Sequence, residues 1–79
     1  MLHLSVNTLG KNIFSGQASF LTVPGVEGEL TVLKGHIPLI TSLKEGRFSY
    51  GTGKKNESLL IKGGVLEVSP REVIVLIDV

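Results

Sequence analysis

The sequence predicts an all-β fold, a small two-sheet β-sandwich or flattened barrel of about eight to ten short antiparallel strands. Three observations lead to this class. Apolar and polar residues alternate over short segments, as Leu2, Leu4 and Val6 do at the start of the chain. Turn-forming residues recur roughly every 6–12 positions, and no segment of useful length has the helical period. These patterns leave the choice between a sandwich and an up-and-down barrel open.

Turn residues divide the first part of the chain into three expected strands. The first has its apolar face on Leu2, Leu4 and Val6, and a turn follows at residues 9–12. Pro24 and Gly25 are expected to end the third, because proline lacks an N–H and glycine permits a positive φ. The second and third strands are expected at Ile13–Phe14 and Ala18–Val23.

The central segment from Gly25 to Leu43 contains two apolar runs, Leu30–Leu33 and Leu39–Leu43, on either side of a loop with glycine and proline. Both runs alternate as strands with one polar face do, and Leu39, Thr41 and Leu43 share one face of the second. The segment is therefore expected to hold four polar side chains on a rigid scaffold: Glu27, Glu29, Lys34 and His36.

The last part of the chain is expected to add three or four more strands. Lys44–Gly46 forms a turn, a strand covers Arg47–Tyr50, and the polar residues 51–57 form a hairpin tip. The strand Ser58–Lys62 is broken or bulged at Gly63 and Gly64 and continues through Val65–Ser69. Residues 70–72 turn the chain again. The final run, Val73–Ile77, is apolar without alternation, which is typical of a strand covered on both faces.

Length and composition indicate one domain over residues 1–79. There is no cysteine, so disulfides and thiolate metal sites are excluded. The net charge of +1 gives no electrostatic argument for a nucleic-acid partner, and 5% aromatic residues are too few for a base-stacking surface. No apolar run approaches the roughly 20 residues of a membrane-spanning helix. The composition predicts an ordinary soluble domain.

No motif in the chain predicts catalysis, a cofactor or a metal ion. His3 and His36 lack metal-ligand spacing, and Glu27 and Glu29 lack the apolar pocket that would separate the pKa values of an acid–base pair. No glycine loop precedes a helix, and there is no Gly-x-Ser-x-Gly motif. His3 is expected to be solvated, whereas His36 is either a loop imidazole bonded to local backbone or a functional residue.

The run VEGELTVLKGHIPLITSLKEGRFSY, followed by ESLLIKGGVLEVSPREVIVLID, closely resembles the N-terminal β-sandwich domain of the epsilon subunit of F-type (F1Fo) ATP synthase. That family has an acidic Glu-Gly-Glu segment, then Pro-Gly-His-Ala-Pro-Leu, and later Gly-Gly-hydrophobic-Leu-Glu-Val. The resemblance extends from the first strand to Asp78. Three positions in or beside the loop depart from the pattern: Thr31, Lys34 and Ile37 stand where glycine, proline and alanine are usual.

The resemblance implies a non-catalytic central-stalk subunit that binds the gamma subunit and the polar loops of the proteolipid c-ring, coupling ion translocation to ATP synthesis. It implies no cofactor and a peripheral location on the ATP-synthesising membrane, at the cytoplasmic face of a bacterial inner membrane, reached only through the complex. The matching ring-contact positions are Gly25, Val26, Glu27, Gly28 and Glu29, with Glu29 the acidic contact. The matching gamma-contact positions are Thr8, His36 and Thr41.

Longer members of the family continue into a helical hairpin that inhibits ATP hydrolysis. No such C-terminal helical domain is expected here, because the residues stop at Val79 soon after Ile77-Asp78, so neither inhibition nor ATP binding is carried over. An inhibitory module is therefore the least favoured function. The runner-up is a small-ligand-binding β-barrel, against which the short chain argues. The interior of so small a domain is expected to be filled by side chains, which leaves little space for a ligand: Phe14, Phe20, Leu30, Leu60, Leu66 and Val75.

Overall fold

The computed structural model describes residues 1–79, and every regular element in it is a β-strand. The all-β prediction is therefore confirmed, and the structure has no helix that is long and apolar enough to cross a membrane. The nine strands are β1 (Leu2–Thr8), β2 (Lys11–Ala18), β3 (Phe20–Gly25), β4 (Gly28–Leu33), β5 (Leu39–Leu43), β6 (Gly46–Gly51), β7 (Asn56–Ile61), β8 (Gly63–Val68) and β9 (Val73–Asp78).

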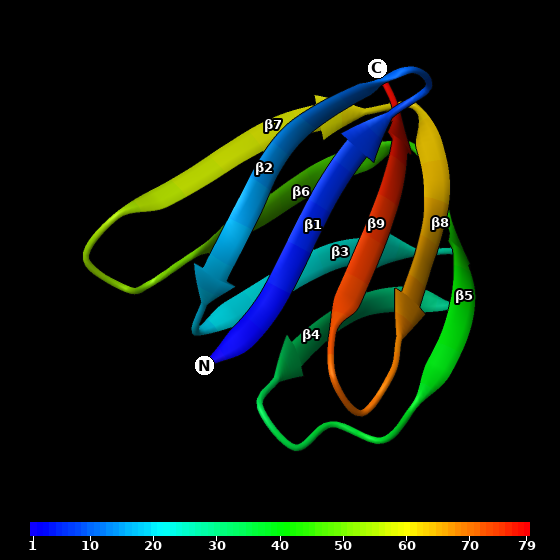
Figure 1. Ribbon diagram of the computed structural model, residues 1–79. Helices are drawn as coiled ribbons and strands as arrows, with labels where there is room; N and C mark the ends of the chain where they lie inside the picture. Colours follow the sequence, from blue (N-terminus) through cyan, green and yellow to red (C-terminus); the bar gives the residue numbers. More distant parts are fainter.

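The strands form two layers of one curled sheet (Figure 1). One layer has the order β2-β1-β9-β8-β5, and the other consists of β4-β3-β6-β7. The layers join at a corner where Gly25 of β3 pairs with Leu43 of β5. Every pairing is antiparallel, as predicted, except that β1 and β9 are parallel. The exception arises because the β8–β9 hairpin returns the chain beside its own first strand, running in the same direction.

The core lies between the two layers and is entirely apolar apart from the tyrosine hydroxyl. Phe48 is fully buried, and its ring lies 5.5 Å from that of Tyr50, which in turn lies 5.0 Å from Phe14 on the opposite layer. Of the six residues expected to fill the interior, Leu66 and Val75 are fully buried, while Phe14, Phe20 and Leu30 are only partly buried. The expectation for Leu60 is wrong: it is 68% exposed, because it lies on the outer face opposite Arg47.

Two expected breaks in the first part of the chain are absent. The strand expected at Ile13–Phe14 extends over the whole of β2, since Gly16 pairs with Leu4 and the ladder continues through it. Pro24 lies inside β3 rather than ending it. It pairs opposite Glu29, and its carbonyl oxygen accepts a hydrogen bond from the Lys44 N–H at 2.8 Å. Proline is tolerated there because that position needs no backbone donor.

Gly63 and Gly64 mark a change of layer. The sequence allowed one strand to continue through them, but β7 pairs with β6 and β8 pairs with β5 and β9. The N–H of Lys62, between β7 and β8, donates to Asp78 at 2.6 Å. Gly64 has φ +153°, and a Cβ there would overlap the carbonyl oxygen of Leu76. The glycine is therefore required where β8 pairs closely with β9, opposite Ile77.

The expectation that the last strand is covered on both faces is wrong. Val73, Val75 and Ile77 are buried, but Leu76 is 44% exposed and Ile74 is half-buried on the outer face. Val65 pairs opposite Leu76 on this face, whereas Ile74 pairs opposite Glu67 and Ser5. We call Ile40, Val65, Ile74 and Leu76 the outer apolar patch.

The outer face of the other layer is chemically different. A row of four hydroxyl side chains crosses β4, β3, β6 and β7 in register. The hydroxyl oxygens of its first two members lie 3.1 Å apart, and Arg47 donates to the last at 3.0 Å. The row consists of Thr31, Thr22, Ser49 and Ser58. This face therefore presents polar side chains to solvent, whereas the outer apolar patch presents apolar ones.

Candidate functional site

The predicted ring-contact residues form one tight hairpin turn between β3 and β4. Val26 and Glu27 make the turn, and Gly25 pairs with Gly28 across it. Gly28 has φ +133°, and a Cβ on Gly25 would lie 2.8 Å from the Gly28 carbonyl oxygen, so both positions favour glycine. The N–H of Val26 donates to Ser42 at 3.1 Å and ties the turn to β5.

The side chains of this turn point outward as an acidic surface. Glu27 and Glu29 are both exposed, and the apolar side chain of Val26 in the same turn is 52% exposed. Because the backbone is held by the pairing of β3 with β4 and by the hydrogen bond from Val26 to β5, we expect little conformational entropy to be lost when a partner binds here.

Thr41 lies beside this acidic turn, which the sequence did not predict. It is half-buried on β5, and its Oγ1 donates to the Ser42 carbonyl at 3.4 Å. A groove between β4 and β5 brings Thr41 next to four of the predicted ring-contact residues, Gly25, Glu27, Gly28 and Glu29. Its walls are Gly28, Glu29 and Leu30 on β4 and Leu39, Ile40 and Thr41 on β5.

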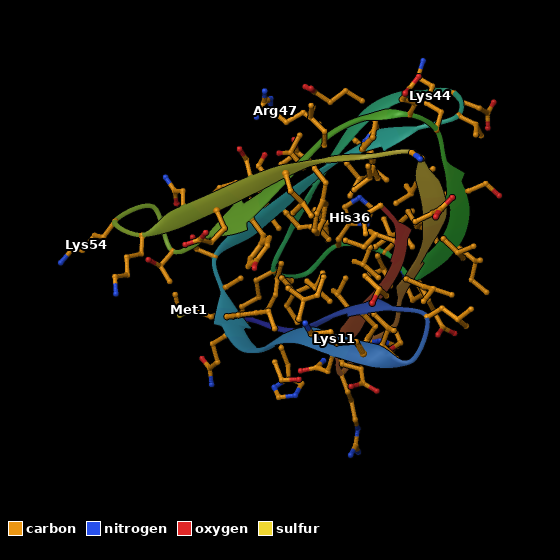
Figure 2. All side chains as sticks on the ribbon, turned by 90° about the horizontal axis from the view of Figure 1, so that it is seen from above. Met1, Lys11, His36, Lys44, Arg47 and Lys54 are labelled. Atoms are coloured by element: carbon orange, nitrogen blue, oxygen red, sulfur yellow. The ribbon has the colours of Figure 1, made fainter.

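His36 lies in the loop between β4 and β5 and bonds to local backbone, the first of the two interpretations left open by the sequence. Its backbone N–H donates to the Leu33 carbonyl oxygen at 3.1 Å, and its side-chain Nδ1 lies 2.9 Å from the Ile37 carbonyl oxygen. Since a carbonyl only accepts, Nδ1 carries the proton in this contact. Seen from above, His36 lies within the outline of the strands (Figure 2), where the loop closes one end of the sandwich.

Thr8 lies at the opposite end of the same layer, where β1 meets the turn into β2 (Figure 1). Its Oγ1 donates to the Lys11 carbonyl at 3.5 Å. Thr8, His36 and Thr41 therefore do not cluster. They are distributed around the layer β2-β1-β9-β8-β5, whose outer face carries the outer apolar patch.

The sequence analysis missed the outer apolar patch. Ile40 is 71% exposed and Val65 43% exposed. The sequence feature that could have indicated the patch is the run Val73–Ile77, whose residues are apolar on both faces of the strand. A chain this short rarely supplies a second layer over the outer face, so apolar residues there are left exposed.

No three potential metal-ligating side chains come together, and no buried side-chain nitrogen or oxygen lacks a hydrogen-bond partner. His3 is exposed on β1. Burial, and further the nearby charge of Glu57, raises the pKa of Tyr50.

Comparison with known proteins assigns the family. The model of the ATP synthase Delta/Epsilon chain β-sandwich domain matches residues 1–79. The chain belongs to this family. Among curated relatives, the ATP synthase epsilon chain of Dehalococcoides mccartyi is 39% identical over 77 residues, and that of Bordetella avium is 41% identical over 78. Both alignments cover 98% of this chain and 55% of the relative, so the chain spans about half the length of these proteins.

Solved structures share the fold. A chain in the OSCP/F1/c-ring structure of the Euglena gracilis mitochondrial ATP synthase superposes with a TM-score of 0.88 at 24% identity, over 96% of this chain and 49% of that one. A chain in the central stalk and c-ring of the Tetrahymena thermophila enzyme gives 0.85 at 14% identity, over 99% and 63%. The two-layer sandwich is thus the family's β-sandwich domain.

Proposed function

We propose that this domain is a non-catalytic part of the central stalk of an F-type ATP synthase. It joins the gamma subunit to the c-ring and so helps to couple ion translocation to ATP synthesis. The observation that carries the proposal is that the family match covers residues 1–79. The features of this domain that could contact partners are the acidic turn and the outer apolar patch. The complex places it peripherally on the energy-transducing membrane, at the cytoplasmic face of a bacterial inner membrane.

The acidic turn is the proposed ring contact. Gly25, Val26, Glu27, Gly28 and Glu29 present two carboxylates and one apolar side chain on a backbone held by β5. A rigid turn suits a subunit that must transmit torque, because displacement of the partner then moves the whole sandwich. Glu29 is the charge proposed to meet a basic group on the polar loops of the ring.

The layer with the outer apolar patch is the proposed gamma contact. Ile40 is 71% exposed and Leu76 44% exposed, and burial of such surface stabilises an interface by roughly 25 cal/mol per Å². Of the matched positions, Thr8 and Thr41 lie on β1 and β5 of the same layer, and His36 lies in the loop that leads into β5. A stable contact requires about 800 Å² per partner, so it must extend beyond the four patch residues.

Calorimetric titration against the gamma subunit of the same organism tests the proposal. We expect one-to-one binding that is weakened at least tenfold by Leu76→Glu and by Thr41→Arg, since each places a charge in the contact. Ser58→Glu, on the hydroxyl face of the other layer, is the matched control and should bind as the native chain does. Glu29→Lys should retain gamma binding and weaken assembly with the ring. Equal effects of Leu76→Glu and Ser58→Glu would contradict the assignment of the face.

A further inference from the structure

A pocket of about 340 Å³ opens at the end of the sandwich where the β4–β5 loop, the β8–β9 turn and the start of β1 meet. Its lining includes two cationic side chains, Lys34 and Arg71. The imidazoles of His3 and His36 also line it, and Glu72 is the only carboxylate residue in the lining. We call it the basic pocket, because its two cations exceed its one carboxylate.

Lys34 is held in a tight turn within the β4–β5 loop. The His36 backbone N–H donates to the Leu33 carbonyl oxygen at 3.1 Å, and Gly35 has φ +85°. Only glycines have a positive φ in this chain, so Lys34 and Gly35 are the two central residues of a type II turn. Proline is favoured at the first central position, because its ring fixes the φ that the turn requires. Lysine at this position gives up that rigidity and supplies a charge.

Arg71 is held in the turn between β8 and β9. The backbone N–H and the hydroxyl of Ser69 both donate to the Glu72 carbonyl oxygen at 2.9 Å, and the Glu72 N–H donates to the Ser69 hydroxyl oxygen at 3.3 Å. Pro70 has the φ that suits the first central position of this turn. Lys34 and Arg71 are thus exposed side chains on turns whose backbones are held by hydrogen bonds.

The basic pocket adjoins the proposed gamma contact. A shallow hollow beside it shares four of its lining residues: Pro38, Val68, Ser69 and Pro70. The same hollow extends to Ile40, which belongs to the outer apolar patch. His36, one of the matched gamma positions, lines the basic pocket itself. A partner that covers Ile40 and His36 therefore lies beside Lys34 and Arg71.

Charge distinguishes this end of the sandwich from the acidic turn. Glu27 and Glu29 are exposed on that turn, and residues 25–29 do not line the basic pocket. A partner carboxylate is attracted to Lys34 and Arg71 and repelled by the acidic turn, whereas the basic group proposed on the ring experiences the reverse. The two regions therefore favour partners of opposite charge.

We propose that the basic pocket binds an aspartate or glutamate side chain of the gamma subunit, which pairs with Lys34 and Arg71. This inference rests on the proposed function and specifies how the gamma contact is oriented. The arginine fork matches the two oxygens of a carboxylate, and the lysine adds a second cation. Glu72 balances only one of these charges, so a positive charge remains for the partner.

Carbodiimide cross-linking of the 79-residue chain to the gamma subunit of the same organism tests the pairing. The reagent activates a carboxylate, which then forms an amide with an adjacent amine while the reagent leaves as a urea. We expect Lys34 to be joined to an aspartate or glutamate of gamma, located by mass spectrometry of the digested product. Lys54 is exposed in the β6–β7 turn, far from His36 (Figure 2), and should form no such link. It is the internal control.

Calorimetric affinities separate charge from fold. Lys34→Pro removes the cation and suits the turn, so gamma binding should weaken by about threefold while the midpoint of thermal unfolding stays the same or rises. Lys34→Glu combined with Arg71→Glu should weaken binding at least about tenfold, because like charges then meet. Lys54→Glu combined with Lys55→Glu makes the same change in net charge away from the pocket, and should bind within about a factor of two of the native chain.

The outcomes separate the two claims. A complex that shows no Lys34 cross-link and keeps its affinity when Lys34 and Arg71 are reversed would overturn the pairing and leave the central-stalk function standing. Equal losses on reversing these two residues and on reversing Lys54 and Lys55 would show that net charge alone acts, and would also overturn the pocket. A cross-link from Lys34 to the ring in the assembled complex would overturn gamma as the occupant. Absence of any complex with a folded gamma subunit would overturn both claims.

Discussion

Replacing Gly64 with alanine should destabilise the domain severely, because this position combines a positive φ with a crowded backbone. The φ of +153° is strained for any residue with a Cβ, at about 1–3 kcal/mol. The new Cβ would overlap the Leu76 carbonyl oxygen and lie 3.1 Å from the Ile77 Cα. Moving β9 away would weaken one or two ladder hydrogen bonds, at about 1 kcal/mol each. We expect a total loss of about 2–5 kcal/mol.

This loss is large for so small a domain, whose 79 residues support a free energy of unfolding of about 4–12 kcal/mol. Urea unfolding followed by far-UV circular dichroism measures it, and the midpoint of thermal unfolding should fall by at least about 8 °C. Gly63→Ala is the matched control. Its Cβ would meet only the Leu43 carbonyl oxygen, at 3.4 Å, and its φ is not positive. Equal unfolding midpoints for the two variants would refute the reasoning.

Three further predictions concern the core, the tyrosine and the β1–β2 hairpin. Phe48→Ala should cost about 3–5 kcal/mol in urea unfolding because the ring is fully buried, whereas Leu60→Ala, at a 68% exposed position, should cost less than about 1 kcal/mol. Burial, and secondarily Glu57, raises the pKa of Tyr50, so its absorbance titration should have a midpoint above 10. The folded state then binds the phenolic proton more tightly than the unfolded state does. The stabilisation that results is complete below pH 10 and is lost as the pH rises through the raised pKa of the folded state. Tyr50→Phe should remove this pH dependence of the free energy of unfolding. Asn12→Ala should cost about 1 kcal/mol in urea unfolding, because the Asn12 side-chain amide donates at 2.8 Å to the Asn7 Oδ1 across the hairpin.

The sequence predicted the strands well where polar and apolar residues alternate. Leu2, Leu4 and Val6 are buried, and the faces of β4 and β5 are as expected. The chain breaks were less predictable. Pro24 reads as a breaker, yet it occupies a strand position whose N–H is not needed, which depends on register and not on local preference. Gly64 could have been a bulge or a break, and only the close approach of β9 decides it.

The site was predictable in part for a related reason. The acidic turn is a local feature, so the residues that form it could be read from their order in the chain. The groove and the outer apolar patch could not, because they depend on how β4 and β5 diverge and on which face of β9 is left open. Five consecutive apolar residues, Val73–Ile77, contain no information about which of their two faces is covered.

The parallel pairing of β1 with β9 has a consequence for folding kinetics. Hairpins such as β6–β7 join neighbours in sequence, but the contact between the Asn7 amide and the Val75 carbonyl links residues 68 positions apart. Such non-local closure is slow, and folds rich in it need milliseconds to seconds. During synthesis at about 5–20 residues per second, the roughly 65 residues between Thr8 and Val73 take about 3–13 s to appear. For that interval the edge of β1 that β9 later covers is open to other nascent chains, so chaperone occupancy and aggregation should be decided by how quickly the last strand arrives.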